Sequence, residues 1–102
     1  PLLPTAAPTA PAALAQGSWP NPFNPQTRLY FTLPAAGDAR LSVHDAAGRR
    51  VALLWDGPAP AGRSEVDWTA RDATGRALPA GLYLYRLETP AGRAGGKLML
   101  LP

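Results

Sequence analysis

The chain has 102 residues, no cysteine and a formal net charge of +3, so it fits one domain and no disulfide can brace it. Its 13 prolines and 10 glycines argue against a helical protein. The basic residues are scattered along the sequence and interleaved with acids, whereas nucleic-acid binding needs a basic stripe on one face. No apolar run approaches the roughly 20 residues that span a bilayer. We therefore expect neither a nucleic-acid partner nor a membrane span.

Residues 1–18 form an uncharged segment rich in proline and alanine, which we call the arm. Proline removes backbone donors and fixes φ, so the arm favours polyproline II or extended structure. Such a segment can bind the open edge or a groove of a neighbouring sandwich, or it can be a flexible linker. Thr5 and Thr9 are candidate O-glycosylation sites. The candidate assembly residues of the arm are Leu2, Leu3, Pro4, Pro8, Pro11 and Leu14.

Residues 19–102 are expected to form one all-β domain. From residue 27 the apolar side chains recur with a period of two, which is typical of half-buried strands. Residues 57–62 are expected to form a proline-rich loop. Residues 82–88 carry apolar side chains on both faces, as a central strand does. Regular turn signals between short strands indicate a sandwich or a barrel. The predicted strands are residues 27–33, 39–45, 50–55, 63–68, 82–88 and 97–101.

Two predicted turns share the pattern Asp-Ala-X-Gly, with Asp45 and Gly48 in the first and Asp72 and Gly75 in the second. An aspartate at the first turn position can accept hydrogen bonds from backbone N–H groups, and a glycine three residues later tolerates a positive φ. Gly81 redirects the chain before the strand of residues 82–88. We assign these five residues structural roles in turns.

No constellation of catalytic residues emerges from the sequence. His44, the single histidine, is expected to face outward on its strand beside Ser42, without an orienting acid or an activated hydroxyl. We therefore assign no catalytic residue and expect no enzyme. Four aspartates could suggest a calcium site, but none lies in a D-x-D-x-D-G loop, so we assign no metal. We also assign no cofactor. They are Asp45, Asp56, Asp67 and Asp72.

Aromatic side chains suggest a third kind of site, because exposed aromatic rings stack well on sugars. Three of the aromatic residues are expected to face the core: Trp68, Tyr83 and Tyr85. The remaining candidates for a sugar-binding platform are Trp19, Tyr30 and Trp55.

Several of these motifs occur together in a known family. The chain resembles the C-terminal sorting domain of the type IX secretion system and the related immunoglobulin-like domain of flagellar hook-capping proteins. The resemblance implies a seven-stranded, immunoglobulin-like antiparallel β-sandwich at the end of large exported bacterial proteins, where it addresses the cargo to the outer-membrane translocon. The matching segments are 21–25, 33–34, 43–45, 48–49, 66–68, 72–76 and 79–87.

These observations predict a non-catalytic, exported module located outside the cell or on its surface. Because no cargo domain precedes the sandwich in this sequence, we expect the arm to dock on a neighbouring copy. Repeated head-to-tail, that contact builds an extracellular filament after the subunit has passed the secretion translocon. Two alternatives stay open: a C-terminal sorting and surface-anchoring domain of a larger type IX cargo protein, and a carbohydrate-binding module.

Overall fold

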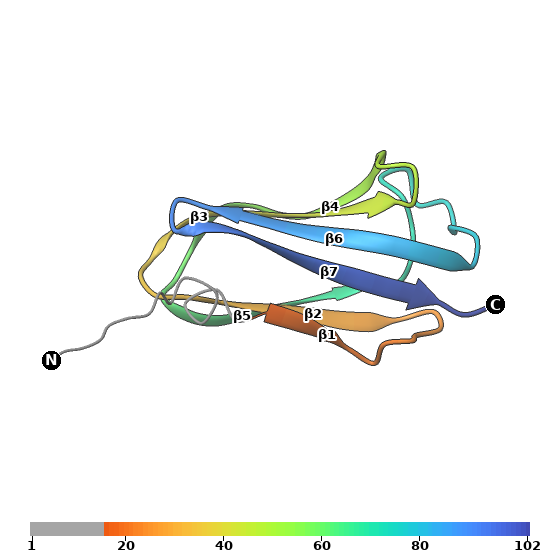
Figure 1. Cartoon of the computed structure of the whole chain (residues 1–102), viewed down its shortest axis with the longest axis horizontal. Coiled ribbons are helices and arrows are strands. Elements are labelled where there is room, and N and C mark those ends of the chain that lie inside the picture. The colour runs from red at the N-terminus through yellow and green to blue at the C-terminus, as the bar shows by residue number, and fades with distance from the viewer. Residues whose placement is uncertain (1–15) are drawn as a thin grey trace, which may run out of the picture.

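The structure is a computed structural model that describes residues 16–102 as two antiparallel sheets facing each other (Figure 1). The strand order is β1-β2-β5 in one sheet and β4-β3-β6-β7 in the other. This arrangement confirms the predicted immunoglobulin-like antiparallel β-sandwich. In the described part of the chain, no helix has the length and apolar character needed to cross a membrane. The strands are β1 (Gln16–Trp19), β2 (Thr27–Leu33), β3 (Gly37–Asp45), β4 (Arg50–Ala59), β5 (Gly62–Trp68), β6 (Gly81–Thr89) and β7 (Gly92–Leu100).

The core lies between the two sheets, where the alternating apolar side chains of facing strands meet. Phe31 of β2 contacts Trp55 of β4 edge to face, with ring centres 5.3 Å apart. Trp68 lies between Phe23 and Tyr83, at 5.9 and 6.1 Å between ring centres. The most completely buried apolar side chains are Phe23, Leu29, Phe31, Leu41, Val43, Leu87 and Leu98.

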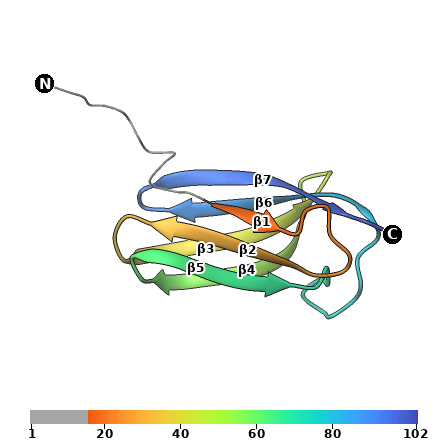
Figure 2. The ribbon, with the colours of Figure 1, turned by 90° about the horizontal axis from the view of Figure 1, so that it is seen from below.

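The first strand, β1, lies where the arm was expected. It pairs antiparallel with β2, from Gln16 opposite Phe31 to Trp19 opposite Arg28. Figure 2 shows β1 beside β2, on the side of the molecule where β6 and β7 run. Residues 16–18, which the sequence assigned to the arm, therefore belong to a strand of the sandwich. Gln-Gly-Ser-Trp has no apolar alternation, so the sequence pattern carried no signal for this strand.

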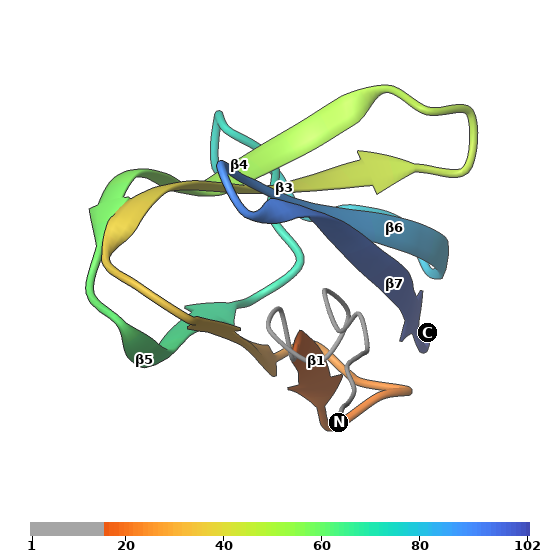
Figure 3. The same ribbon diagram turned by 60° about the vertical axis from the view of Figure 1, so that its left-hand side comes forward.

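Strand β4 continues through residues that were expected to form a loop. Residues 57–59 pair with residues 37–39 of β3, so only residues 60–61 make the turn to β5. Pro58 fits there because β4 is an edge strand, and the missing N–H costs no ladder bond on the open side. Figure 3 shows this turn joining the two sheets on the side away from β7.

A β-bulge explains why the face of residues 50–55 was ambiguous in the sequence. Leu41 pairs with Trp55 and Ser42 pairs with Leu53, which leaves Leu54 as an extra residue on β4. The extra residue breaks the period of two, so Trp55 packs inward while Leu53 faces solvent.

Strand β7 begins at Gly92, five residues before the predicted start at residue 97. Gly96 is required at its position, because an added Cβ would lie 2.7 Å from the Tyr85 hydroxyl oxygen and 2.8 Å from the ring. The same close approach that requires glycine removes the side-chain alternation by which a strand is recognised in a sequence.

Candidate functional site

A loop at the start of the domain closes on the last strand, and it is the most distinctive local structure of the chain. This loop, residues 20–25, is called the clasp. The Phe23 N–H donates to the Met99 carbonyl at 2.9 Å, and the Leu101 N–H donates to the Phe23 carbonyl at 2.8 Å. Phe23 thereby forms a short parallel bridge to the end of β7.

The asparagine side chains of the clasp add further bonds to the same strand. The Asn21 amide nitrogen donates to the Lys97 carbonyl at 2.8 Å, and its amide oxygen accepts from the Met99 N–H at 3.0 Å. The Asn24 amide nitrogen donates to the Pro102 carbonyl at 2.7 Å. These bonds connect positions at least 76 residues apart in the sequence.

The composition of the clasp accounts for its conformation. Prolines at positions 20, 22 and 25 remove backbone donors and prevent the loop from continuing as a ladder strand. The intervening asparagines and Phe23 are then free to turn toward β7, and the Phe23 side chain is buried at 2% exposure. Because β7 is an edge strand, its outward N–H and C=O groups would otherwise invite pairing with another chain. The clasp occupies these groups from Lys97 to Leu101.

In the sequence, this segment marks the beginning of the domain, and residues 21–25 are among the segments that resemble the family. The Asn-Pro-Phe-Asn-Pro spacing was a usable signal for a rigid loop, but nothing in it identifies β7 as the partner. A further link joins the two sheets: the Gln16 side chain accepts a hydrogen bond from the Tyr85 hydroxyl and connects β1 to β6.

The first of the two predicted Asp-Gly turns is held by one carboxylate. The Asp45 carboxylate accepts the N–H groups of Ala47 and Arg49 at 3.0 and 2.9 Å, and the Gly48 N–H donates to the Asp45 carbonyl. Gly48 has φ of 91°. The backbone N–H of Arg49 is the main cause of a lowered pKa of Asp45, with smaller contributions from the Arg49 side chain and the Ala47 N–H.

The second turn repeats this geometry at Asp72. Its carboxylate accepts the Thr74 hydroxyl at 2.7 Å and the N–H groups of Thr74 and Arg76, each at 2.9 Å. Gly75 has φ of 87°. The Thr74 hydroxyl is the main cause of a lowered pKa of Asp72, followed by the Arg76 N–H. Gly81, the fifth predicted turn residue, opens β6 with φ of 145°.

Ser42 and His44 lie together, with 3.0 Å between the hydroxyl oxygen and Nε2 of the imidazole. The other ring nitrogen of His44, Nδ1, lies 3.3 Å from the Gly48 carbonyl oxygen. In a catalytic triad a carboxylate occupies the position that this backbone oxygen has here. Ser42 was expected to be outward and is 2% exposed. Its paired residues on the neighbouring strands are Leu53 and Arg86, which are both exposed.

Asp45 and Asp72 line one cleft, but all four aspartates considered for calcium are engaged in ion pairs or turns. Asp67 pairs with Arg28 at 2.7 Å, and this hydrogen bond is the main cause of a lowered pKa of Asp67. Asp56 lies 3.6 Å from Arg40, and Asp45 and Asp72 hold their turns. Within residues 16–102, no three His, Asp or Glu side chains gather into a group that could hold a metal ion.

The structure brings together two of the three aromatic residues considered for sugar binding. Trp19 is 77% exposed and Tyr30 lies beneath the Arg63 guanidinium, which stands 4.0 Å from the ring centre. Both line a cleft of about 570 Å³ on the outer face of the β1-β2-β5 sheet. Trp55 packs against Phe31 between the sheets and takes no part in it. The carbohydrate-binding alternative stays a prediction that rests on Trp19 and Tyr30.

The assembly and glycosylation residues assigned to the arm lie outside the described residues. They are Leu2, Leu3, Pro4, Thr5, Pro8, Thr9, Pro11 and Leu14.

Comparisons with known proteins agree with this fold. Residues 23–92 match the family described as the FlgD Ig-like domain. The structure of FlgD from Xanthomonas campestris, whose hook capping is described as essential for flagellar assembly, is 26% identical with a TM-score of 0.58. The match covers 83% of this chain and 61% of that one. A comparison with curated proteins finds no match.

Two further structures, both from Porphyromonas gingivalis, share the fold. Dimeric latent PorU is 19% identical with a TM-score of 0.69, over 84% of this chain and 9% of that one. PorZ, described as an essential surface component of the type-IX secretion system, is 21% identical with a TM-score of 0.54, over 89% and 12% respectively. The chain thus spans less than two thirds of the length of each of these three structures.

Proposed function

Because the chain belongs to the family of FlgD Ig-like domains, we propose that it is a sorting and assembly domain of a larger exported protein, which it directs through the type IX secretion translocon to the cell surface. The domain itself is a structural, non-catalytic module. The observation that carries the proposal is the recurrence of this fold as a small part of much longer chains. It covers 9% of PorU and 12% of PorZ, the latter described as a type IX secretion component.

The clasp supports a role as a self-contained terminal module. A domain of this size is usually marginal by itself, and this one has no disulfide. By attaching β7 to the beginning of the sandwich, the clasp closes the domain without help from a neighbouring domain. Such a module can be joined to many cargo proteins while its own recognition surface stays the same.

Export of a reporter tests the proposal. A fluorescent protein with a signal peptide is fused in front of residues 1–102 and expressed in a bacterium that has type IX secretion, and in the same strain without the translocon. We expect surface or medium fluorescence only with both the domain and the translocon. A reporter that stays in the periplasm, while the host's own sorting domain exports the same reporter, would refute the proposal.

A second candidate function is self-association through the arm into an extracellular filament, and the position of β1 favours it. The strand is at the edge of its sheet, and the arm precedes it directly in the sequence. A proline-rich segment that starts from a sheet edge is suitably placed to reach a neighbouring copy. The same position limits the length of the arm that can bind a partner. Residues 16–18 pair with β2 of their own sandwich, so the partner-binding segment would have to come from residues 1–15.

Comparison of two chain lengths tests this candidate. Residues 16–102 contain all seven described strands, so the shortened chain is expected to fold. Electron microscopy and light scattering of residues 1–102 should show fibres or large assemblies, and residues 16–102 should be monomeric. Monomers for both lengths would exclude arm-driven assembly and leave the sorting function as the only proposal.

A further inference from the structure

The outer face of the β4-β3-β6-β7 sheet is divided into two regions of different chemistry. Directly paired residues of antiparallel strands lie on the same face of a sheet. The strand register therefore shows which outward side chains lie in one row across the four strands. In the row nearest the end of β6, Arg40 is opposite both Asp56 and Glu88, and Glu88 is opposite Arg93. Acid and base alternate across all four strands in this row, which is therefore balanced in charge.

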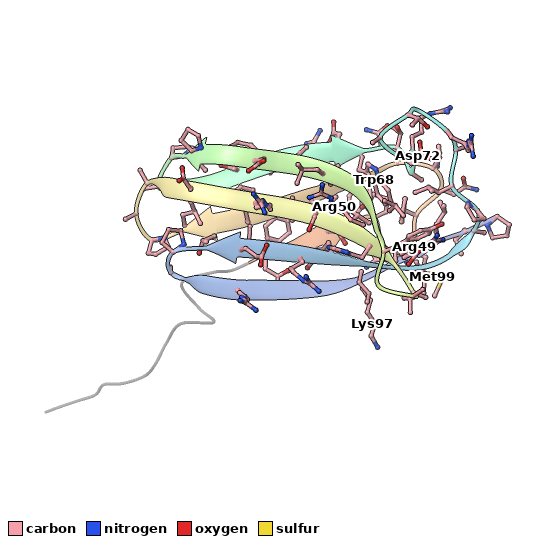
Figure 4. All side chains as sticks on the ribbon, turned by 90° about the horizontal axis from the view of Figure 1, so that it is seen from above. Arg49, Arg50, Trp68, Asp72, Lys97 and Met99 are labelled. Carbon is pink, nitrogen blue, oxygen red and sulfur yellow. The ribbon has the colours of Figure 1, made fainter. Side chains whose placement is uncertain are left out.

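The rows beyond it contain no carboxylate at their paired outward positions. His44 is opposite Arg50 and Leu84, and Leu84 is opposite Lys97. In the neighbouring rows, Ser42 is opposite Arg86 and Leu82 is opposite Met99. We call this region the basic-apolar face and define it by six residues: Arg50, Leu82, Leu84, Arg86, Lys97 and Met99. Figure 4 views the molecule from this side and shows Lys97 projecting away from β7.

The cations of the basic-apolar face are free of ion pairs. Among residues 16–102, ion pairs engage the side chains of Arg28, Arg40, Arg49 and Arg63. Arg50, Arg86 and Lys97 are exposed and form none. Asp45, the carboxylate nearest to Arg50 in the sequence, accepts hydrogen bonds within its own turn. Glu88, two residues from Arg86, lies opposite Arg40 and Arg93 in the charge-balanced row. Half of the six cations that form no ion pair within residues 16–102 therefore lie on this face, and the other three are Arg71, Arg76 and Arg93.

Exposed apolar side chains gather at the same place. Of the six large apolar side chains that are exposed in the described residues, Leu82, Leu84 and Met99 belong to this face and a fourth, Leu53, borders it opposite Ser42. Apolar side chains at the centre, with arginine and methionine among them, are the composition of protein interfaces. Unpaired cations around that centre select an acidic partner.

We propose that the basic-apolar face is the surface by which the domain docks on an acidic protein surface of the secretion machinery. This inference rests on the proposed sorting function and names the surface that performs it. A protein fits better than a lipid bilayer, because Leu82 and Leu84 are each only 37% exposed and Met99 40%. Side chains that protrude so little complement a flat protein surface but reach poorly into the acyl region of a membrane.

Paired substitutions in the reporter fusion test the proposal. For charge, Lys97→Glu is compared with Arg93→Glu, since Arg93 is also an exposed residue of β7 without an ion pair within residues 16–102 but lies in the charge-balanced row. For apolar contact, Leu84→Ser is compared with Trp19→Ser, which changes a more exposed side chain on the other sheet. Circular dichroism and thermal melts of each purified domain verify folding. We expect export to fall about tenfold for the two face variants and to stay unchanged for the two controls.

The remaining outcomes separate this inference from the function on which it rests. If the unmodified fusion is exported and the folded face variants are exported equally well, the face is not the docking surface but the sorting function stands. If the unmodified fusion is not exported, both proposals fail. The purified domain is also sedimented with phosphatidylglycerol vesicles. Vesicle binding that Lys97→Glu abolishes would assign the face to a membrane and overturn the protein-docking proposal.

Discussion

Substitution of Phe23 by alanine tests whether the clasp is part of the core or a surface loop that does not contribute to stability. The Phe23 backbone bonds to Met99 and Leu101 can persist in the variant, so the change removes only the side chain. That side chain is 2% exposed and its ring lies 5.9 Å from the ring of Trp68. The experiment therefore measures the contribution of ring burial separately from the strand bridge.

The expected loss follows from burial. Removing a buried phenylalanine ring costs about 3–5 kcal/mol of unfolding free energy. A domain of this length has a total stability of roughly 5–10 kcal/mol, so Phe23→Ala should remove a third of it or more. At roughly 4–8 °C per kcal/mol, the melting temperature should fall by at least about 12 °C.

Urea denaturation followed by tryptophan fluorescence is the suitable assay, because Trp68 is a neighbour of the deleted ring. Two variants serve as references. Trp19→Ala removes a side chain that is 77% exposed and should change the stability by less than about 0.5 kcal/mol. Asn21→Ala removes two hydrogen bonds to β7 and should cost about 1–2 kcal/mol. If Phe23→Ala costs no more than Trp19→Ala, the clasp is not part of the core and our account of the site is wrong.

Two further predictions concern the turns and the close packing of β7. The lowered pKa values of Asp45 and Asp72 mean that their contribution to stability is complete above the unfolded pKa of about 3.9 and is lost as the pH falls through the folded pKa. Urea denaturation across pH should show this acid decline, and Asp72→Asn should flatten it; an unchanged decline would contradict the assignment. Gly96→Ala should destabilise by about 1–3 kcal/mol, because its Cβ would lie 2.7 Å from the Tyr85 hydroxyl oxygen. Gly37→Ala, with no atom within 4 Å, is the matched control in the same thermal melt, and equal melting temperatures would disprove the close contact.

Local rules of the sequence were sufficient for most of the fold. The period of two in residues 27–33 identified β2, and the turn chemistry of Asp45 and Asp72 was readable because each turn is stabilised within five residues. The errors occurred where a strand lacks alternation. Gly17 in β1 and Gly96 in β7 are glycines because tyrosine rings lie against them, and that requirement arises in another strand.

The clasp and the basic-apolar face could be predicted less well from the sequence than the strands. The prolines around Phe23 mark a rigid loop, but its partner lies 76 residues later at Met99, and no local pattern encodes that distance. The cations at positions 50, 86 and 97 appear scattered in the sequence. Only the register of β4, β3, β6 and β7 brings them to one face without a carboxylate among them.

The long span bridged by the clasp has a consequence for the order of events during biogenesis. From a ribosome or a membrane pore, Phe23 emerges 76 residues ahead of Met99, to which its backbone bonds. Until then the polypeptide lacks Leu98 and Leu100, two side chains that the finished interior requires. Compaction of the domain is therefore expected to wait until β7 has emerged, and a chain interrupted before β7 is expected to stay open to proteases. The clasp can form only in chains that extend through β7.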